Sequence, residues 1–394
     1  MTPLTETAWV FFKLGVLGFG GPAAHIALMK QECVEKRQWL SEAEFLDLLG
    51  ITHLIPGPNS TEMAIHLGFR RAGWFGLLVA GLCFILPAVG LVSLCALAYL
   101  RYGSLPAFAG ILKTMKPVIL AVVLQAIVGL LKPALKTRFL TLLALLVLGL
   151  SLAGVDELGL LFGAGLLSSS LGSLNRGRLK QGPALAKLYL IVMPLMTLPT
   201  LLLNWLLPTH LGQQSASAMP FALAPLFGFF LKVGALLYGS GYVLLAFLHE
   251  TLVSQWHWLS PTQLLDAILI GQVTPGPVFT TATFIGYLLG GPVAAALATL
   301  AIFLPSFLLV AFSQSLVTRL RQFPLTGLFL DGVNAAALAL MGGVILELGR
   351  GALSDGPSLG ICLVSSLLLL VWRVNSAWLI LGAACLGGLF YGGL

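Results

Sequence analysis

The chain has 394 residues, of which 58% are hydrophobic and only 9% are charged. A soluble domain carries roughly 25% charged residues, so this chain cannot cover a water-exposed surface and is predicted to be an all-α polytopic membrane protein. Its net charge of +7 comes from basic residues at the ends of apolar segments, and this placement argues against nucleic-acid binding.

A long internal repeat divides the chain into two halves. The tripeptide Pro56-Gly57-Pro58 returns as Pro275-Gly276-Pro277, an offset of 219 residues. Further positions return in the same register: Trp39-Leu40-Ser41 as Trp258-Leu259-Ser260, Asp47 as Asp266, Lys13 as Lys232 and Thr61 as Thr280. Such a repeat in an apolar chain is typical of transporters built from two related halves. We predict an N-terminal membrane repeat over 1–175, a basic linker with one connecting transmembrane helix over 176–218, and a C-terminal membrane repeat over 219–394.

Each half shows the same order of predicted elements. An apolar segment interrupted by glycines comes first, and a short polar loop follows it. Two short apolar stretches then flank the Pro-Gly-Pro break, each about half of a spanning length, so we expect broken or re-entrant helix hairpins over 44–69 and 263–289. About four transmembrane helices complete each half, predicted over 73–100, 107–131, 139–154 and 157–172, and over 291–317, 326–348, 358–372 and 376–393. A further run, 187–207, is the predicted linker helix.

The basic residues predict the topology of the two halves. Four clusters of basic residues are predicted to be cytoplasmic. They lie around the first polar loop, after residue 69, after residue 131 and in the linker. The first half then enters and leaves on the same side, and the linker helix carries the chain across. The loop between His249 and Trp258 has no Lys or Arg, whereas its counterpart has three, so the second half is predicted to be an inverted-topology repeat. Four residues do not fit this pattern: Arg101, Lys113, Lys116 and Arg350.

The Pro-Gly-Pro breaks are the predicted substrate site. Proline has no amide hydrogen and disfavours a helical conformation in the residue before it, so each break ends one half-helix and starts another. The first turn of the new half-helix has unpaired N–H groups and a positive dipole end, which favour an anion. Hydroxyl and amide side chains beside the breaks would add donors. The candidate substrate-binding residues here are Gly57, Asn59, Ser60, Thr61, Gln272, Gly276, Thr280 and Thr281.

Two lysines and two glycine clusters extend this candidate site. Lys232 follows an uncharged run that places it well inside the apolar zone, and with its repeat mate Lys13 it would supply positive charge for a dianion. The glycine clusters would let another backbone approach closely or free amides for the ligand. Their candidate residues are Gly20 and Gly21 in the first half and Gly239, Ser240 and Gly241 in the second. Structural alternatives stay open: hydroxyls that cap helices, a Lys13 side chain that reaches the interface, and glycines that pack helices.

Acidic and histidine side chains near the breaks are candidates for proton coupling. Asp47 and Asp266 precede the breaks on matched half-helices. His53 and Glu62 flank only the first break, because Gln272 and Thr281 stand at the equivalent positions of the second. This asymmetry suits a proton-coupling role confined to the first half, with an ordinary structural role as the alternative.

The sequence argues against an enzyme. The His-Glu-x-x-His motif is absent, Tyr238-Gly239-Ser240-Gly241 lacks the first glycine of a rhomboid-type Gly-x-Ser-Gly motif, and no Walker A motif is present. The five cysteines share no close spacing, so we expect neither disulfides nor metal ligands, and no cofactor is predicted.

Longer motifs surround the repeated positions. They are Phe11-Phe12-Lys13-Leu14-Gly15, Phe19-Gly20-Gly21-Pro22, Gly239-Ser240-Gly241-Tyr242-Val243, Gly271-Gln272-Val273-Thr274-Pro275-Gly276-Pro277 and Phe329-Leu330-Asp331-Gly332-Val333-Asn334. With these motifs the chain resembles the long, two-domain form of the chromate ion transporter family over nearly its whole length.

The resemblance implies a multi-pass bacterial transporter of the cytoplasmic (inner) membrane that exports chromate by secondary active transport and confers chromate resistance. The partners it implies are a chromate- or sulfate-like oxyanion and the lipid bilayer, with a homodimer left open. Two alternatives also stay open: uptake or exchange of sulfate or another oxyanion, and an anion channel.

Overall fold

The computed structural model describes residues 2–18, 21–52, 55–103, 105–153, 155, 157–175, 220–237, 244–320, 324–353, 355–372, 374 and 376–391. Every regular element in these ranges is helical. Four helices are long and apolar enough to cross a membrane, judged by length and composition: Asn59–Tyr102, Phe108–Ala134, Val278–Phe312 and Gly327–Arg350. The prediction of an all-α, multi-pass membrane protein is confirmed. The predicted linker helix, 187–207, lies outside the described residues.

The two halves contain the same succession of elements, except that the second half has an additional 3₁₀-helix, η5. The first half forms α1 (Pro3–Leu17), α2 (Gly21–Met29), the π-helix η1 (Lys30–Lys36), α3 (Glu42–Thr52), α4 (Asn59–Tyr102), α5 (Pro106–Ala134), α6 (Arg138–Leu152) and α7 (Glu157–Asn175). The second half forms α9 (Leu223–Leu236), α10 (Leu244–Leu248), the π-helix η4 (His249–Gln255), α11 (Pro261–Val273), the 3₁₀-helix η5 (Val278–Thr280), α12 (Thr281–Leu320), α13 (Pro324–Ala352), α14 (Gly356–Leu370) and α15 (Ser376–Tyr391).

Local distortions of the backbone also repeat. The π-helices η1 and η4 begin at Lys30 and His249, which are 219 residues apart. In the loops that follow them, Gln38 (φ 49°) and His257 (φ 54°) share the left-handed conformation at the same offset. Since π-helices and left-handed non-glycine residues are both uncommon, their recurrence at matched positions shows that the two halves fold alike.

Helices α4 and α12 each contain a sharp bend. The bend lies at Ala72 and Gly73 in α4 and at Gly290 and Gly291 in α12, where the backbone leaves helical geometry. Each bend separates a predicted short stretch from the long run that follows it. The second half-helix of each predicted hairpin therefore joins the first long run directly, through two residues that leave helical geometry.

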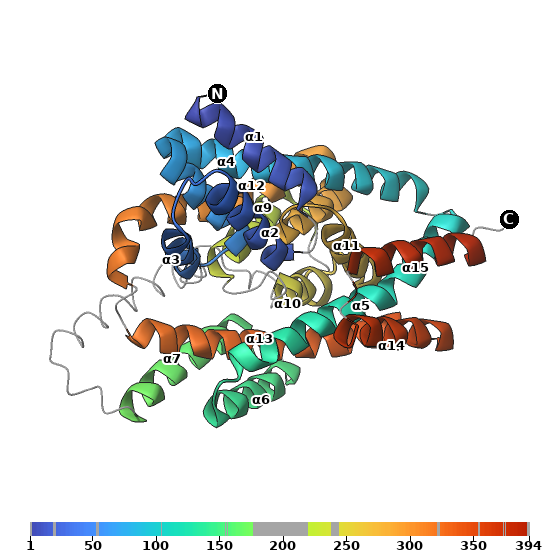
Figure 1. The fold of residues 1–394 in the computed structure, drawn as a ribbon. Helices are drawn as coiled ribbons and strands as arrows, with labels where there is room; N and C mark the ends of the chain where they lie inside the picture. Colours follow the sequence, from blue (N-terminus) through green and yellow to red (C-terminus); the bar gives the residue numbers. More distant parts are fainter. Residues whose placement is uncertain are drawn as a thin grey trace.

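Helices from both halves build two layers (Figure 1). In one layer α1 packs on α4, α9 packs on α12, and α4 packs on α12. In the other layer α5 of the first half packs on α14 and α15 of the second, and α13 of the second half packs on α6 and α7 of the first. The largest buried apolar cluster runs through both halves. Each half thus completes its packing with helices of the other, and the two are interlocked.

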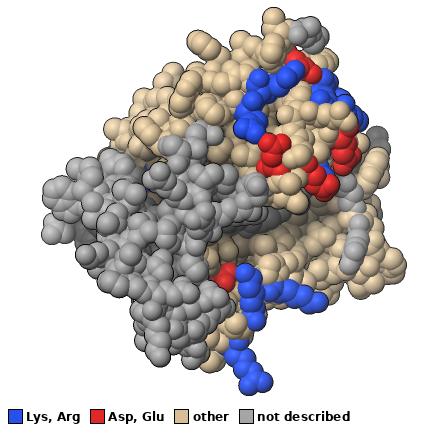
Figure 2. Space-filling view, turned by 60° about the vertical axis from the view of Figure 1, so that its left-hand side comes forward, with Lys and Arg blue, Asp and Glu red and all other residues tan. Residues whose placement is uncertain are grey.

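Charged side chains lie on the face of the molecule at one end of the helices. The long helices run from left to right in Figure 1, and Figure 2 brings the left-hand side forward. On this face Lys and Arg lie beside Asp and Glu in two groups, with uncharged surface between them. Large apolar side chains are exposed along the helices, among them Leu142, Phe312 and Trp378. Apolar flanks with charges at the helix ends suit a bundle surrounded by lipid.

Candidate functional site

Each Pro-Gly-Pro break is hydrogen-bonded to the opposite half of the chain. The Gly57 N–H donates to the Leu237 carbonyl at 2.7 Å, and the Gly276 N–H donates to the Gly18 carbonyl at 2.9 Å. Gly18 and Leu237 are repeat mates that end α1 and α9. The first helix of each half therefore holds the break of the other, and both breaks lie at the interface between the halves.

The glycine of each break is required by the backbone and by its neighbours. Gly57 has φ 138° and Gly276 has φ 97°, values that residues with a side chain rarely adopt. A β-carbon at Gly57 would clash with Glu62 Oε1 and Ser306 Oγ, and one at Gly276 would lie 2.6 Å from the Ala88 β-carbon. Ala88 and Ser306 occupy matching positions on α4 and α12, so these close contacts also repeat.

The helix after each break starts without a side-chain cap. Pro58 and Pro277 are the N-cap residues of α4 and η5, and neither start receives a capping hydrogen bond from a side chain. The residues of the first turns, including Ser60 and Thr280, are buried. Uncapped N–H groups at the positive end of a buried helix form an environment that favours an anion.

The hydroxyl groups beside the two breaks differ. Thr280 donates to the Pro277 carbonyl and Thr281 to the Val278 carbonyl, both at 2.8 Å. The backbone therefore uses the hydroxyl protons that we expected to face a ligand, because a first-turn hydroxyl reaches the carbonyl three residues before it. The Thr61 hydroxyl, in contrast, is buried and has no hydrogen-bond partner within the described ranges. At the first break, the Thr61 hydroxyl is therefore available to donate a hydrogen bond to a ligand.

Glu62 is fully buried at the first break. The Ser306 hydroxyl of α12 faces its carboxyl group. Neither carboxyl oxygen, nor that hydroxyl, has a well-oriented hydrogen bond in the part of the chain that the structure describes. Sequence reasoning missed Ser306, because only the packing of α12 on α4 brings it to this break. Thr281 and Ala88 stand at the matching positions, so the second break lacks this pair.

The two candidate lysines lie in different surroundings. The Lys13 ammonium is 3.0 Å from Glu32 Oε1, and 39% of the Lys13 side chain is exposed. Lys232 is buried in α9, the helix whose end holds the first break. We expected both lysines to act as counter-charges for a dianion. The two lysines therefore differ in exposure, and Lys232 is the one buried beside the interface between the halves.

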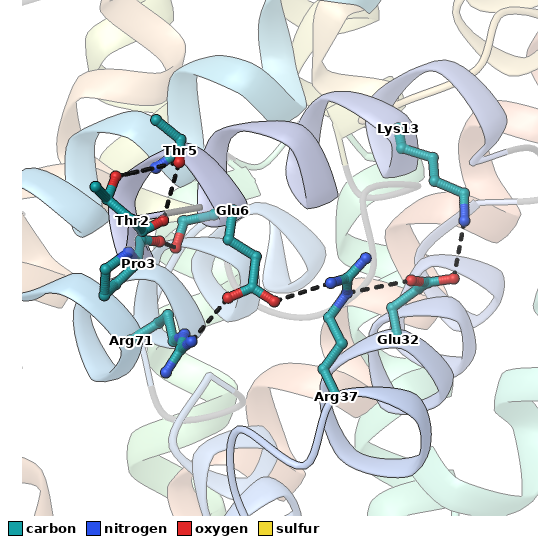
Figure 3. Close-up of polar contacts among 9 residues, drawn as sticks. Thr2, Pro3, Thr5, Glu6, Lys13, Glu32, Arg37 and Arg71 are labelled. Atoms are coloured by element: carbon teal, nitrogen blue, oxygen red, sulfur yellow. Dashed lines mark hydrogen bonds and ion pairs between the residues drawn. The ribbon is translucent and has the colours of Figure 1, made fainter.

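A charged cluster joins α1, η1 and the bend of α4 (Figure 3). Arg37 lies between two acids, 2.9 Å from Glu6 and 3.6 Å from Glu32. Arg71, which directly precedes the bend, is 2.7 Å from Glu6. Lys13 completes the cluster through Glu32. The cluster attaches the first helix and the polar loop to the bend of α4.

Glu32→Gln is expected to destabilise the protein in a pH-dependent way. Burial raises the pKa of Glu32, but hydrogen bonds from Lys36 and Lys13 lower it more, so the folded pKa lies below its ordinary value of 4.5. The stabilisation by the charged carboxylate is complete above the unfolded pKa and is lost as the pH falls through the folded pKa. We expect a free energy of unfolding lower by about 2 kcal/mol at neutral pH, measured by denaturant unfolding in detergent.

The matched control for this variant is Glu35→Gln, an exposed position of the same π-helix. It should unfold like the wild type. A difference between wild type and Glu32→Gln that stayed the same at acidic and neutral pH would contradict this role of Glu32.

Asp266 links the halves through a buried ion pair. It lies on α11, 3.0 Å from Lys116 Nζ on α5, and accepts a hydrogen bond from the Tyr99 hydroxyl of α4 at 3.0 Å. Lys113 is likewise 2.8 Å from Asp355, the N-cap of α14. Lys113 and Lys116 are two of the four basic residues that do not fit the predicted topology, and both are paired with an acidic residue.

Some of the remaining candidate residues are described by the structure and others are not. Gly21 starts α2 with φ 77°, Gln272 is half-buried in α11, and Asn59 is the first residue of α4. Within the described ranges, no group of three or more His, Cys, Asp or Glu residues could hold a metal ion. Outside the described residues lie Gly20, His53, Gly239, Ser240 and Gly241, and also the side chain of Asp47 on α3.

The fold and the site define a class of protein. Apolar helices with exposed apolar flanks form a multi-pass membrane protein, and helices broken at matched positions of two repeats are typical of secondary transporters. The chain belongs to the chromate transporter family, whose model matches residues 5–169 and 224–388. These two matches are offset by 219 residues, like the Pro-Gly-Pro breaks.

Full-length relatives agree with this assignment. The chain is 29% identical over 392 residues to the chromate transport protein of Cupriavidus metallidurans, covering 98% of this chain and 92% of the relative. It is 30% identical over 359 residues to the chromate transport protein of Pseudomonas aeruginosa, covering 89% and 82%. The search of solved structures gives no match. The family resemblance indicated by the sequence motifs is confirmed.

Proposed function

We propose that the chain is a secondary transporter that exports chromate across the cytoplasmic membrane, with both Pro-Gly-Pro breaks forming one oxyanion site. The observation that carries this proposal is the reciprocal bonding of the breaks, Gly57 to Leu237 and Gly276 to Gly18. Two uncapped helix starts held at one interface would direct N–H groups and positive dipole ends at the same anion. The names of both full-length relatives support chromate as the substrate.

In the membrane the two repeats would have opposite orientations. The halves pack reciprocally, as expected for two repeats related by a pseudo-two-fold axis, and the distribution of basic residues favours an axis in the membrane plane. Lys113 and Lys116, on the side predicted to be external, are paired with Asp355 and Asp266. Paired lysines oppose the positive-inside rule less than free ones do, which supports the inverted arrangement.

The membrane potential would favour export. Moving one charge across 100 mV changes its free energy by about 2.3 kcal/mol. The free energy of a dianion therefore falls by about 4.6 kcal/mol when it leaves a cell that is negative inside by this potential. This difference corresponds to a roughly 2000-fold lower internal concentration at equilibrium. A selective pathway energised by the membrane would therefore lower cytoplasmic chromate without ATP.

The test is the flux of radiolabelled chromate in proteoliposomes with an imposed potential. We expect saturable chromate movement toward the positive side and reduced chromate accumulation in cells that express the protein. Absence of both effects would refute the proposed function. Preference for sulfate in direct competition would favour another oxyanion as substrate, and single-channel currents would favour a channel.

Lys232→Ala is expected to lower chromate flux about tenfold or more, because it removes a buried lysine from α9, the helix whose end holds the first break. Lys13→Ala is the matched variant in the other half. Its loss should be smaller, because the Lys13 side chain is 39% exposed and lies 3.0 Å from Glu32. Initial rates at equal amounts of reconstituted protein measure both. Full transport by Lys232→Ala, or equal losses in both variants, would remove Lys232 from the site.

A further inference from the structure

Glu62 and Ser306 form a buried polar pair at the first break. The Glu62 side chain is fully buried on the first turn of α4, in the part of this helix that precedes the bend at Ala72, and the Ser306 hydroxyl faces it. Both side chains lie against Gly57, at the place where its β-carbon would be. Neither has a well-oriented hydrogen bond within the described residues. A carboxyl group of the first half and a hydroxyl group of the second half therefore lie together beside the proposed oxyanion site. Both groups can still form hydrogen bonds.

Several charged side chains that the structure describes on α4 and on the helices packed against it have partners away from Glu62. They pair as Lys13 with Glu32, Glu6 with Arg71, Glu44 with Arg70 and Asp266 with Lys116, while the His25 ring contacts the Gly18 carbonyl. On α4 itself, buried His66 follows Glu62 by one turn. The residue of α12 that lies beside Gly57 and Glu62 is Ser306, which is uncharged.

A charged Glu62 and a dianion at the same helix start would repel each other. The site is buried, so the effective dielectric constant is well below that of water and the repulsion is strong. A protonated Glu62 removes this repulsion and offers an O–H donor to the oxyanion. The Ser306 hydroxyl can donate to the charged carboxylate or accept from the neutral acid. Binding of the oxyanion and protonation of Glu62 therefore favour one another.

We propose that Glu62, together with Ser306, binds one proton with each oxyanion, so that the proton and the oxyanion cross the membrane in the same direction. The proton comes from the aqueous phase on the side where the site is open and forms an O–H bond at a Glu62 carboxyl oxygen. It dissociates on the opposite side when the oxyanion leaves. This inference rests on the proposed oxyanion site. Thr281 and Ala88 replace the pair at the second break, so one proton per transport cycle is expected.

This coupling is compatible with export where the membrane potential outweighs the pH gradient, because an alkaline cytoplasm opposes the outward movement of the proton. A dianion and one proton together carry one net negative charge, and an inside-negative potential drives that charge outward. The coupling adds a dependence on the proton gradient. Substrate is then released preferentially into the more alkaline compartment, since loss of the proton leaves a carboxylate that repels the anion.

Proton uptake during binding tests the proposal directly. The purified protein is titrated with sulfate in weakly buffered detergent solution with a pH indicator, over a range of pH. Sulfate is the probe because it has no titratable proton near neutral pH, so any proton taken up is bound by the protein. We expect the wild type to take up close to one proton per bound sulfate at its maximum, and Glu62→Gln to bind sulfate without proton uptake.

A flux measurement complements the binding experiment. In proteoliposomes at zero potential, an imposed pH gradient should drive sulfate through the wild type toward the alkaline side. Glu62→Gln should carry sulfate only down its own gradient. The matched control is Glu44→Gln, at a half-exposed carboxylate on α3 that pairs with Arg70, and it should behave like the wild type in both experiments.

The outcomes separate this inference from the transport proposal. Sulfate binding by the wild type without proton uptake at any pH would overturn proton coupling at Glu62 and leave transport standing. Unchanged proton uptake by folded Glu62→Gln would do the same. If that variant does not fold, the number of protons that the wild type takes up per bound sulfate still decides whether binding is coupled to a proton. A wild type that neither binds nor moves sulfate or chromate would refute the proposed function itself.

Discussion

Gly57→Ala is expected to reduce chromate flux about 100-fold or more. An alanine at φ 138° costs about 1–3 kcal/mol in backbone strain. Its β-carbon would also clash with Glu62 Oε1 and Ser306 Oγ, so the break must move. The 2.7 Å hydrogen bond from Gly57 to Leu237 would then be lost, and with it the alignment of the α4 start. Initial rates of chromate flux in proteoliposomes measure the loss.

Gly90→Ala is the matched control, because Gly90 lies in the same helix and an added β-carbon there meets no atom within 4 Å. It should transport like the wild type. Gly276→Ala should lose flux as Gly57→Ala does, since its β-carbon would press on Ala88. Wild-type flux through a folded Gly57→Ala protein would show that the first break is not part of the pathway.

Lys116→Ala is expected to destabilise the protein by about 3 kcal/mol, because it leaves the buried Asp266 carboxylate without its ion-pair partner. Only 4% of the Asp266 side chain and 17% of the Lys116 side chain are exposed. The Tyr99 hydroxyl still donates to Asp266, which places the loss at the lower end of the range for broken buried pairs. Denaturant unfolding of the purified protein in detergent measures it.

Two comparisons separate this effect from a general loss of charge. Lys116→Met combined with Asp266→Asn should recover most of the stability, because no uncompensated charge then stays buried. Lys30→Ala removes a lysine from an exposed ion pair with Glu42 and should have no measurable effect. Equal losses in Lys116→Ala and Lys30→Ala would contradict a special role for the Asp266 pair.

The sequence predicted those features that depend on local chain geometry or on repetition. A proline on either side of a glycine predicts a helix break wherever it occurs, and both breaks at residues 56–58 and 275–277 are observed. The offset of 219 residues also predicted that the halves fold alike, and the π-helices and the bends repeat at or close to that offset. The same helix-breaking residues occur in both repeats, so the structure of one repeat checks the prediction made for the other.

Contacts between the halves could not be predicted in this way. Ser306 reaches Gly57 only because α12 packs on α4, and Lys116 meets Asp266 across 150 residues of sequence. The hydroxyls of Thr280 and Thr281 fit a ligand-binding pattern, but whether such a hydroxyl bonds to the backbone or to a ligand depends on its rotamer. Lys13 and Lys232 are equivalent in the repeat and differ in surroundings, because Glu32 has no acidic counterpart at position 251.

The stoichiometry of oxyanion binding tests most directly whether two broken helices form one site. Equilibrium dialysis of the purified protein with radiolabelled sulfate or chromate should give one bound oxyanion per chain, and Gly57→Ala and Gly276→Ala should each abolish binding. Two oxyanions per chain, with each variant losing one and keeping the other, would show that the breaks are separate sites and would contradict the shared site proposed for them.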